Sequence, residues 1–102
     1  MIAQFSVIPL GSGISLGEKV AEVIKVVDES GLAYQATAMG TIVEGSWDDV
    51  MKIIKKCRDT AMQKSDRVVI TISIDERADG LPDRLEGKIK SVERRLGKII
   101  KK

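Results

Sequence analysis

Residues 33–46 read Ala-Tyr-Gln-Ala-Thr-Ala-Met-Gly-Thr-Ile-Val-Glu-Gly-Ser. This stretch predicts two short strands, residues 33–38 and 41–45, joined by a turn at Met39-Gly40. Ser46 follows at once and is a favourable N-cap residue for a helix. We therefore expect a β-hairpin that leads directly into a helix.

A helical pattern lies on each side of this hairpin. Before it, Ser15 and Glu18 have the spacing of a capping box, which predicts a helix from about Leu16, and Gly31 is a typical left-handed stop. The apolar residues of both helices recur at helical spacing and predict one buried face each. Those residues are Val20, Val23, Ile24 and Val27 in the first helix, and Val50, Ile53, Ile54, Cys57 and Ala61 in the second.

A strand pattern occupies each outer flank, at residues 2–9 and 67–75. The order is then strand-helix-strand-strand-helix-strand, with a repeated βαβ half. This order is typical of the ferredoxin-like α/β (α+β) fold, in which two helices cover one face of a four-stranded antiparallel sheet. We expect residues 1–102 to form one such domain.

An extra C-terminal helix completes the expected architecture. Pro82 suits its first position. Four apolar residues repeat along it and predict a single buried seam: Leu85, Ile89, Val92 and Leu96.

The composition excludes several classes of site. The 102 residues include no histidine and one cysteine, Cys57, so a Cys–His pair, an intrachain disulfide and the usual zinc ligands are not available. There is no P-loop and no GxGxxG motif. We expect no metal site and no catalytic residues, hence no enzyme, although a buried Glu44 acting as a general base is a minor alternative.

The chain also lacks the features of a membrane or nucleic-acid protein. No apolar run approaches the roughly 18 residues of a membrane span, and no signal peptide is evident, so we expect a cytoplasmic protein. Residues 84–102 hold eight of the 17 Lys and Arg residues. Because the apolar residues of this segment have helical spacing, we interpret its charged residues as the solvated face of a helix. With three aromatic residues in all, recognition of RNA through the sheet is disfavoured.

Strand alternation predicts a polar sheet face opposite the helices. Because an ordinary solvated face would carry charged residues, hydroxyl and amide groups indicate a face that is covered and hydrogen-bonded. The cover is either the same face of a second subunit or the C-terminal helix, its own or a partner's; an exposed face rich in Ser and Thr is the alternative. The residues are Gln4, Ser6, Gln35, Thr37, Thr71 and Ser73.

Two glycine-containing turns are expected at one end of the sheet. Gly11-Ser12-Gly13 follows the first strand, and Met39-Gly40-Thr41 forms the hairpin turn. Glycine permits close approach of a ligand to the backbone, so together the turns indicate a modest pocket. Either alone is explained by turn formation.

The segment Gly40-Thr-Ile-Val-Glu-Gly45 followed by Trp47 resembles a family of short cytosolic proteins described as thiamine-binding. Residues 7–11, 31–35 and 88–93 extend the resemblance over nearly the whole chain. The resemblance implies a ferredoxin-like fold, association through sheets into homodimers or homotetramers, and thiamine or its hydroxymethylpyrimidine half as ligand. No further cofactor is implied.

Several residues are chemically compatible with such a ligand. Glu44 could accept from the aminopyrimidine amine or balance the thiazolium charge, or it could bind a helix or another subunit. Trp47 could stack on a ring or a cation, or it could be a core or interface residue. Neutral hydrogen bonds could come from Ser12, Gln35, Thr37 and Thr41.

We therefore expect non-catalytic binding of thiamine, or a related pyrimidine or thiazolium compound, by a homo-oligomer. The alternative is a structural or regulatory oligomer with a different ligand or none.

Overall fold

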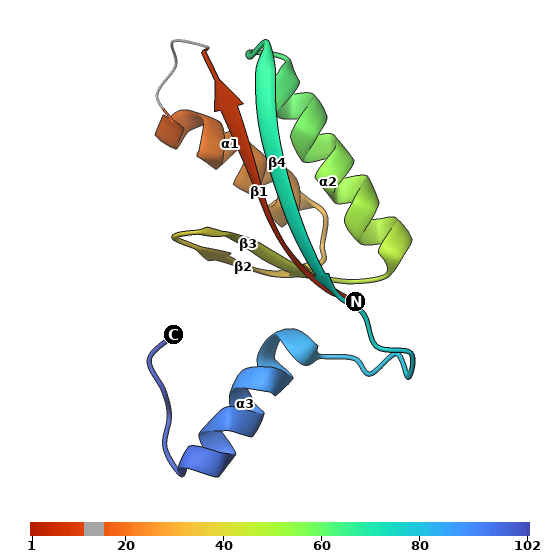
Figure 1. Cartoon of the computed structure of the whole chain (residues 1–102), viewed down its shortest axis with the longest axis vertical. Coiled ribbons are helices and arrows are strands. Elements are labelled where there is room, and N and C mark those ends of the chain that lie inside the picture. The colour runs from red at the N-terminus through yellow and green to blue at the C-terminus, as the bar shows by residue number, and fades with distance from the viewer. Residues whose placement is uncertain (12–15) are drawn as a thin grey trace.

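The computed structural model describes residues 1–11 and 16–102, apart from the Leu16 side chain, and confirms the ferredoxin-like fold (Figure 1). Ser15 of the predicted capping box lies outside the described residues. The elements, in chain order, are β1 (Ile2–Leu10), α1 (Leu16–Glu29), β2 (Ala33–Thr37), β3 (Gly40–Glu44), α2 (Trp47–Met62), β4 (Arg67–Asp75) and α3 (Arg84–Leu96).

The four strands form one antiparallel sheet in the order β2-β3-β1-β4. Strand β1 pairs with β4 along its whole length, from Ile2 opposite Asp75 to Leu10 opposite Arg67. Its pairing with β3 runs only from Ile2 to Phe5, because the β2–β3 hairpin is short. The hairpin turn therefore lies near Phe5, several residues before the end of β1. The predicted proximity of the two glycine turns stays a prediction, because Ser12 and Gly13 lie outside the described residues.

The core lies between the sheet and helices α1 and α2, which cover the same face. It combines Ala3, Phe5 and Val7 of β1 with Val43 of β3 and with the buried stripes of both helices. The α2 stripe is the predicted one: Val50, Ile53, Ile54, Cys57 and Ala61 are all buried.

The predicted face of α1 is correct for Val23 and Val27 and wrong for Val20. The Val20 side chain is 45% exposed, whereas Lys19 is buried. Val20 faces a hollow beside the hairpin turn, and the hairpin is too short to cover it.

Local signals fix the ends of the helices largely as expected. The Ser46 hydroxyl accepts a hydrogen bond of 3.1 Å from the Asp49 N–H at the start of α2. Gly31 has a φ of 78°, the left-handed conformation that lets the chain leave α1.

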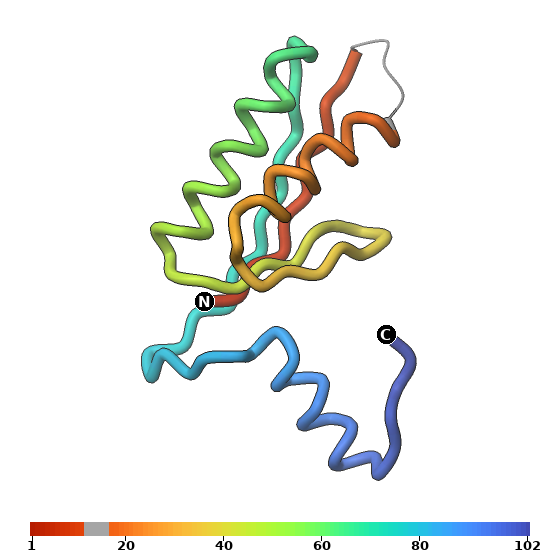
Figure 2. The backbone as a smooth tube through the Cα atoms, turned by 180° about the vertical axis from the view of Figure 1, so that it is seen from behind, coloured from red at the N-terminus to blue at the C-terminus, as the bar shows by residue number. Residues whose placement is uncertain are grey.

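Helix α3 departs from the prediction in two ways. It begins at Arg84 after an Asp83 N-cap, so Pro82 precedes the helix instead of opening it. Its seam is not buried as predicted: Val92 is 44% and Leu96 57% exposed. The reason is visible in Figures 1 and 2, where α3 projects beyond one end of the sheet and only its first turns lie near it.

The hairpin depends on a close backbone approach at Gly40. A Cβ atom there would lie 2.9 Å from the carbonyl oxygen of Phe5, a main-chain atom in the central strand that cannot move aside. We expect Gly40→Ala to lower the free energy of unfolding by about 1–3 kcal/mol, measured by urea denaturation. Gly87→Ala is the matched control, since its Cβ meets nothing within 4 Å. Equal effects of the two variants would contradict this account.

Candidate functional site

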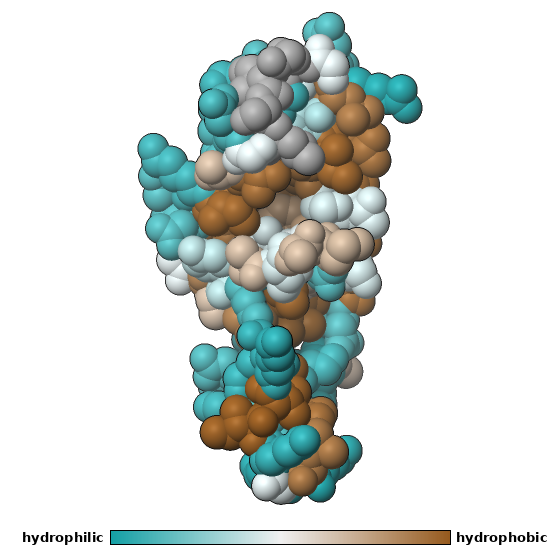
Figure 3. All heavy atoms as spheres, turned by 90° about the vertical axis from the view of Figure 1, so that its left-hand side faces the viewer, coloured by the Kyte–Doolittle hydropathy of each residue, from teal (hydrophilic) through white to brown (hydrophobic). Residues whose placement is uncertain are grey.

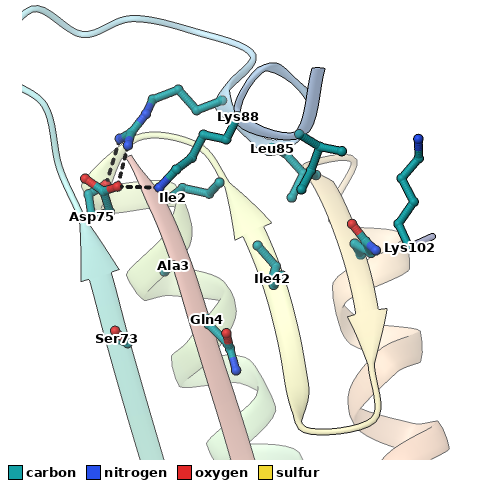
Figure 4. Close-up of a pocket in the computed structure, with 12 residues that line it drawn as sticks. Ile2, Ala3, Gln4, Ile42, Ser73, Asp75, Leu85, Lys88 and Lys102 are labelled. Carbon is teal, nitrogen blue, oxygen red and sulfur yellow. Dashed lines mark hydrogen bonds and ion pairs between the residues drawn. The ribbon is translucent and has the colours of Figure 1, made fainter. Parts of the chain in front are cut away.

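The main candidate site is a groove of about 350 Å³ between α3 and the sheet face that α1 and α2 leave open (Figure 4). We call it the α3 groove. Its lining comes from all four strands, from the first turns of α3 and from the C-terminus: Ile2, Ala3, Gln4, Gln35, Ile42, Ser73, Asp75, Arg84, Leu85, Lys88, Ile89 and Lys102.

One row of side chains across the sheet forms the floor of the groove. The pairing places Gln35 opposite Ile42, Ile42 opposite Gln4, and Gln4 opposite Ser73. Because paired residues of antiparallel strands point to the same face, this row alternates amide, apolar, amide and hydroxyl groups. Leu85 and Ile89 of α3 supply an apolar wall. The floor thus offers a flat apolar rest with hydrogen-bonding groups on both sides.

The charges of the groove gather around Asp75. Its carboxylate accepts hydrogen bonds from the guanidinium of Arg84 and, at 3.0 Å, from the ammonium of Lys88. The hydrogen bonds from Arg84, which has the larger effect, and from Lys88 lower the pKa of Asp75 to about 2. One carboxylate therefore meets two cations at this side of the groove.

Glu44 holds α3 in place. Its carboxylate accepts hydrogen bonds from the backbone N–H groups of Arg84, at 2.7 Å, and of Leu85, at 3.2 Å. These groups lie in the first turn of a helix, where N–H groups have no partner within the helix. Glu44 and Asp75 lie on the two sides of Ile2, so two neighbouring carboxylates bind the same helical turn.

A second hollow, of about 280 Å³, lies between the hairpin turn and α1. We call it the hairpin hollow. Its walls are mainly apolar and include Val20, Ile24 and Met39. Thr41 is buried beside it. The Thr37 hydroxyl takes part in the turn: it donates a hydrogen bond of 2.8 Å to the Gly40 carbonyl and accepts one from the Met39 N–H.

The five predicted ligand residues that the structure describes do not converge on one site. Gln35 lies in the α3 groove, and Thr37 and Thr41 line the hairpin hollow. The Glu44 carboxylate is occupied by the backbone of α3. Trp47, at the start of α2, is 53% exposed and lines neither hollow. Ser12 lies outside the described residues.

Sequence reasoning missed much of the groove. Ile42 could have been found by applying strand alternation to β3 as well as to its neighbours. Asp75 and Arg84 could not, because their pairing depends on where α3 returns to the sheet. Just beyond β4, Arg77 forms an ion pair with Asp79, with a hydrogen bond of 3.0 Å.

The described part of the chain lacks two further features. Residues 1–11 and 16–102 contain no group of three or more His, Cys, Asp or Glu side chains arranged to hold a metal ion. No helix in this part of the chain is long and apolar enough to cross a membrane.

Comparisons with known proteins agree on one family. The model of the family described as "Thiamine-binding protein" matches residues 3–93. Among curated relatives, the UPF0045 protein MJ1052 of Methanocaldococcus jannaschii is 37% identical over 92 residues, which cover 90% of this chain and 91% of the relative. A Mycobacterium bovis relative, UPF0045 protein Mb1933, is 39% identical and covers 94% of each chain.

Solved structures have the same architecture. The crystal structure of MJ1052 superposes with a TM-score of 0.80, covering 89% of this chain and 93% of that one. A Thermotoga maritima protein described as a candidate for thiamine biosynthesis or salvage superposes with a TM-score of 0.77 at 24% identity, covering 89% and 96%. At that identity the second likeness concerns the fold alone.

The role of Glu44 is testable by substitution. Glu44→Ala removes both acceptors at the start of α3, and hydrogen bonds to a charged group each contribute about 1.5–3 kcal/mol. We expect hydrogen exchange at the Arg84 and Leu85 amides to accelerate at least tenfold, measured by NMR, with a smaller change in Glu44→Gln. Asp79→Asn is the control, because Asp79 binds Arg77 on the surface. Unchanged exchange in Glu44→Ala would refute the capping role.

The docking of α3 also depends on pH through Asp75. The pKa of Asp75 is about 2 in the folded chain, below its ordinary 3.8, because Arg84 and Lys88 stabilise the charged form. The contact is therefore complete above the ordinary pKa and is lost as pH falls from about 4 toward 2. We expect the carboxyl carbon of Asp75 to titrate near 2 by NMR, with α3 amide shifts following the same midpoint. A midpoint near 3.8 for Asp75 would contradict the pairing.

Proposed function

The chain belongs to the thiamine-binding protein family, and from that premise we propose that it binds thiamine, or the aminopyrimidine that thiamine contains, in the α3 groove and without catalysis. The observation that carries the proposal is the placing of Gln4 and Gln35 on either side of Ile42, beneath α3.

The proposal rests on complementary hydrogen bonding. An aminopyrimidine presents an exocyclic amine that donates next to a ring nitrogen that accepts. A glutamine amide presents the matching pair, an accepting oxygen and a donating nitrogen, as in the bidentate pairing of glutamine with adenine. Gln4 and Gln35 are two strand spacings apart, about 10 Å, so a ring resting on Ile42 can be reached from both sides.

The apolar walls of the groove suit the same ligand. Ile42, Leu85 and Ile89 would remove the two faces of a flat ring from water, a contribution of about 25 cal/mol per Å² of apolar surface buried. The thiazolium carries positive charge and would be repelled by Arg84 and Lys88. We therefore place the pyrimidine inside the groove and the thiazolium at the mouth, on the side away from these two cations.

Self-association is part of the proposal. The open face carries exposed apolar residues besides its amides and hydroxyls, with Ile8 42% and Val69 41% exposed. Hydrophobic surface is also visible at the lower end of the molecule, where α3 lies (Figure 3). A second copy over the open face would cover these side chains and close the groove. A structural or regulatory oligomer without this ligand is the competing function.

Isothermal titration with thiamine, thiamine phosphate and free hydroxymethylpyrimidine tests the ligand. We expect all three to bind, and Gln35→Leu to weaken each by about 10- to 100-fold, the effect of losing one bidentate pair worth about 1–3 kcal/mol. Met39→Ala is the matched control, since Met39 is exposed in the hairpin hollow.

The outcomes separate the two candidate functions. If Met39→Ala weakens ligand binding and Gln35→Leu does not, the ligand binds in the hairpin hollow and not in the α3 groove. No heat with any of the three compounds, together with an oligomer in solution, would support the structural function.

A further inference from the structure

A third hollow, of about 320 Å³, adjoins the α3 groove next to β2. We call it the tail hollow. Four residues line both spaces, so that one opens beside the other along α3: Gln35, Leu85, Ile89 and Lys102. The remaining lining residues of the tail hollow are charged and belong to α3: Glu86, Lys90 and Glu93. The apolar wall of the α3 groove therefore leads to a space that is bordered by carboxylates.

Glu93 holds the segment that follows α3. Residues 98–102, which we call the tail, run back from the end of α3 toward the sheet (Figures 1 and 2). The Glu93 carboxylate accepts hydrogen bonds from the Lys102 ammonium, at 2.8 Å, and from the Ile100 N–H, at 2.9 Å. These bonds, with that of Lys102 having the larger effect, hold the pKa of Glu93 below its ordinary value, so Glu93 is charged at neutral pH. The pairing keeps Lys102 where the groove meets the tail hollow (Figure 4).

The two partners of this ion pair differ in their access to water. The Lys102 side chain is 46% exposed, whereas that of Glu93 is 15% exposed. A lysine ammonium is strongly hydrated and sits on a flexible stem, so Lys102 can move into water easily. A carboxylate that is largely removed from water is unfavourable without a cation close by.

The charges of the tail hollow balance only while a cation lies beside Glu93. Glu86 and Lys90 pair with each other at 3.4 Å. Departure of Lys102 would therefore leave one unbalanced negative charge among the lining residues, next to the apolar side chains of Leu85 and Ile89. A flat cation with delocalised charge suits such a place, because it is less hydrated than an ammonium, as a guanidinium is.

On the basis of the proposed function, we propose that Glu93 binds the thiazolium ring of thiamine and that Lys102 occupies the place of this ring in the free protein. Binding then exchanges one cation for another. Lys102 moves into water, and the thiazolium comes to lie beside the Glu93 carboxylate, with no covalent bond changed. The tail thus competes with the cationic half of the ligand and not with its pyrimidine half.

The spacing along α3 suits a ligand with two rings. Glu93 follows Ile89 by four residues, which is about 6 Å along the helix axis and on the same helical face. The two rings of thiamine are joined by a single methylene carbon, so a pyrimidine against Ile89 would bring the thiazolium near Glu93. Arg84 and Lys88 lie about 14 Å and 8 Å back along the axis from Glu93, so the thiazolium is kept away from both cations.

Isothermal titration of the whole chain with thiamine and with hydroxymethylpyrimidine tests the exchange. The quantity compared is the ratio of the two association constants, because hydroxymethylpyrimidine lacks the cationic ring. We expect Glu93→Gln to lower this ratio about fivefold, the upper range for a partly exposed ion pair, and Lys102→Met to raise it. Asp59→Asn is the matched control and should leave the ratio unchanged, since Asp59 pairs with Lys55 on α2, over the other face of the sheet.

A second measurement follows the tail directly. By NMR, thiamine should shift the side-chain signals of Lys102 toward those that Lys102 has in the Glu93→Gln variant, whereas hydroxymethylpyrimidine should not. This readout would not change if Glu93 merely tied the tail to α3.

Failure of the exchange is distinguishable from failure of thiamine binding. If both compounds bind and Glu93→Gln leaves their ratio unchanged, the thiazolium lies elsewhere and only the role of Glu93 is overturned. A lower ratio in Lys102→Met would show that Lys102 assists the ligand, which contradicts the exchange. If neither compound binds the unmodified chain, the proposed function and the exchange fail together.

Discussion

The antiparallel register of β1 is the constraint on which the rest of the structure depends. Side chains alternate along a strand, so one register fixes the contents of both faces. Phe5 and Val7 enter the core because Gln4 points to the other side, and Gln4 meets Ile42 and Ser73 because β3 and β4 align there. A slip of one residue would place the amide of Gln4 in the core and expose Phe5. Folding stability and the α3 groove are therefore specified by the same hydrogen-bond ladder.

The groove also depends on how α3 is attached. Ile2 is flanked by Glu44 on one strand and Asp75 on the other, and both carboxylates bind the first turn of α3. Glu44 satisfies backbone N–H groups, whereas Asp75 pairs with the guanidinium of Arg84, whose side chain is 8% exposed. Burying that cation without a partner would be costly, so the ion pair and the position of the helix are linked. The position of α3, which forms the wall of the groove, is therefore set more by these charged contacts than by apolar packing.

Sequence patterns predicted the fold well because its determinants are local. Ser46 caps α2, Gly31 ends α1, and alternation in β4 identifies its two faces, all from neighbouring residues. The site was harder because it combines residues distant in the chain. Glu44 was considered as a ligand residue, yet its partners lie about 40 positions away. The buried seam expected for α3 was wrong for a related reason, since helical spacing identifies an apolar face without showing what covers it.

Because the hairpin is short, β1 has a neighbouring strand on both sides for only about half of its length and on one side for the rest. From Ser6 to Leu10 its described pairing is with β4 alone, and two-stranded ribbons twist more and are less stable than wider sheets. Thermal opening should therefore begin at the Leu10–Arg67 end and advance toward Ile2. The groove lies at the Ile2 end, which opens last. A ligand there would therefore contact the most stable part of the sheet, while the Leu10–Arg67 end opens and closes without disturbing it.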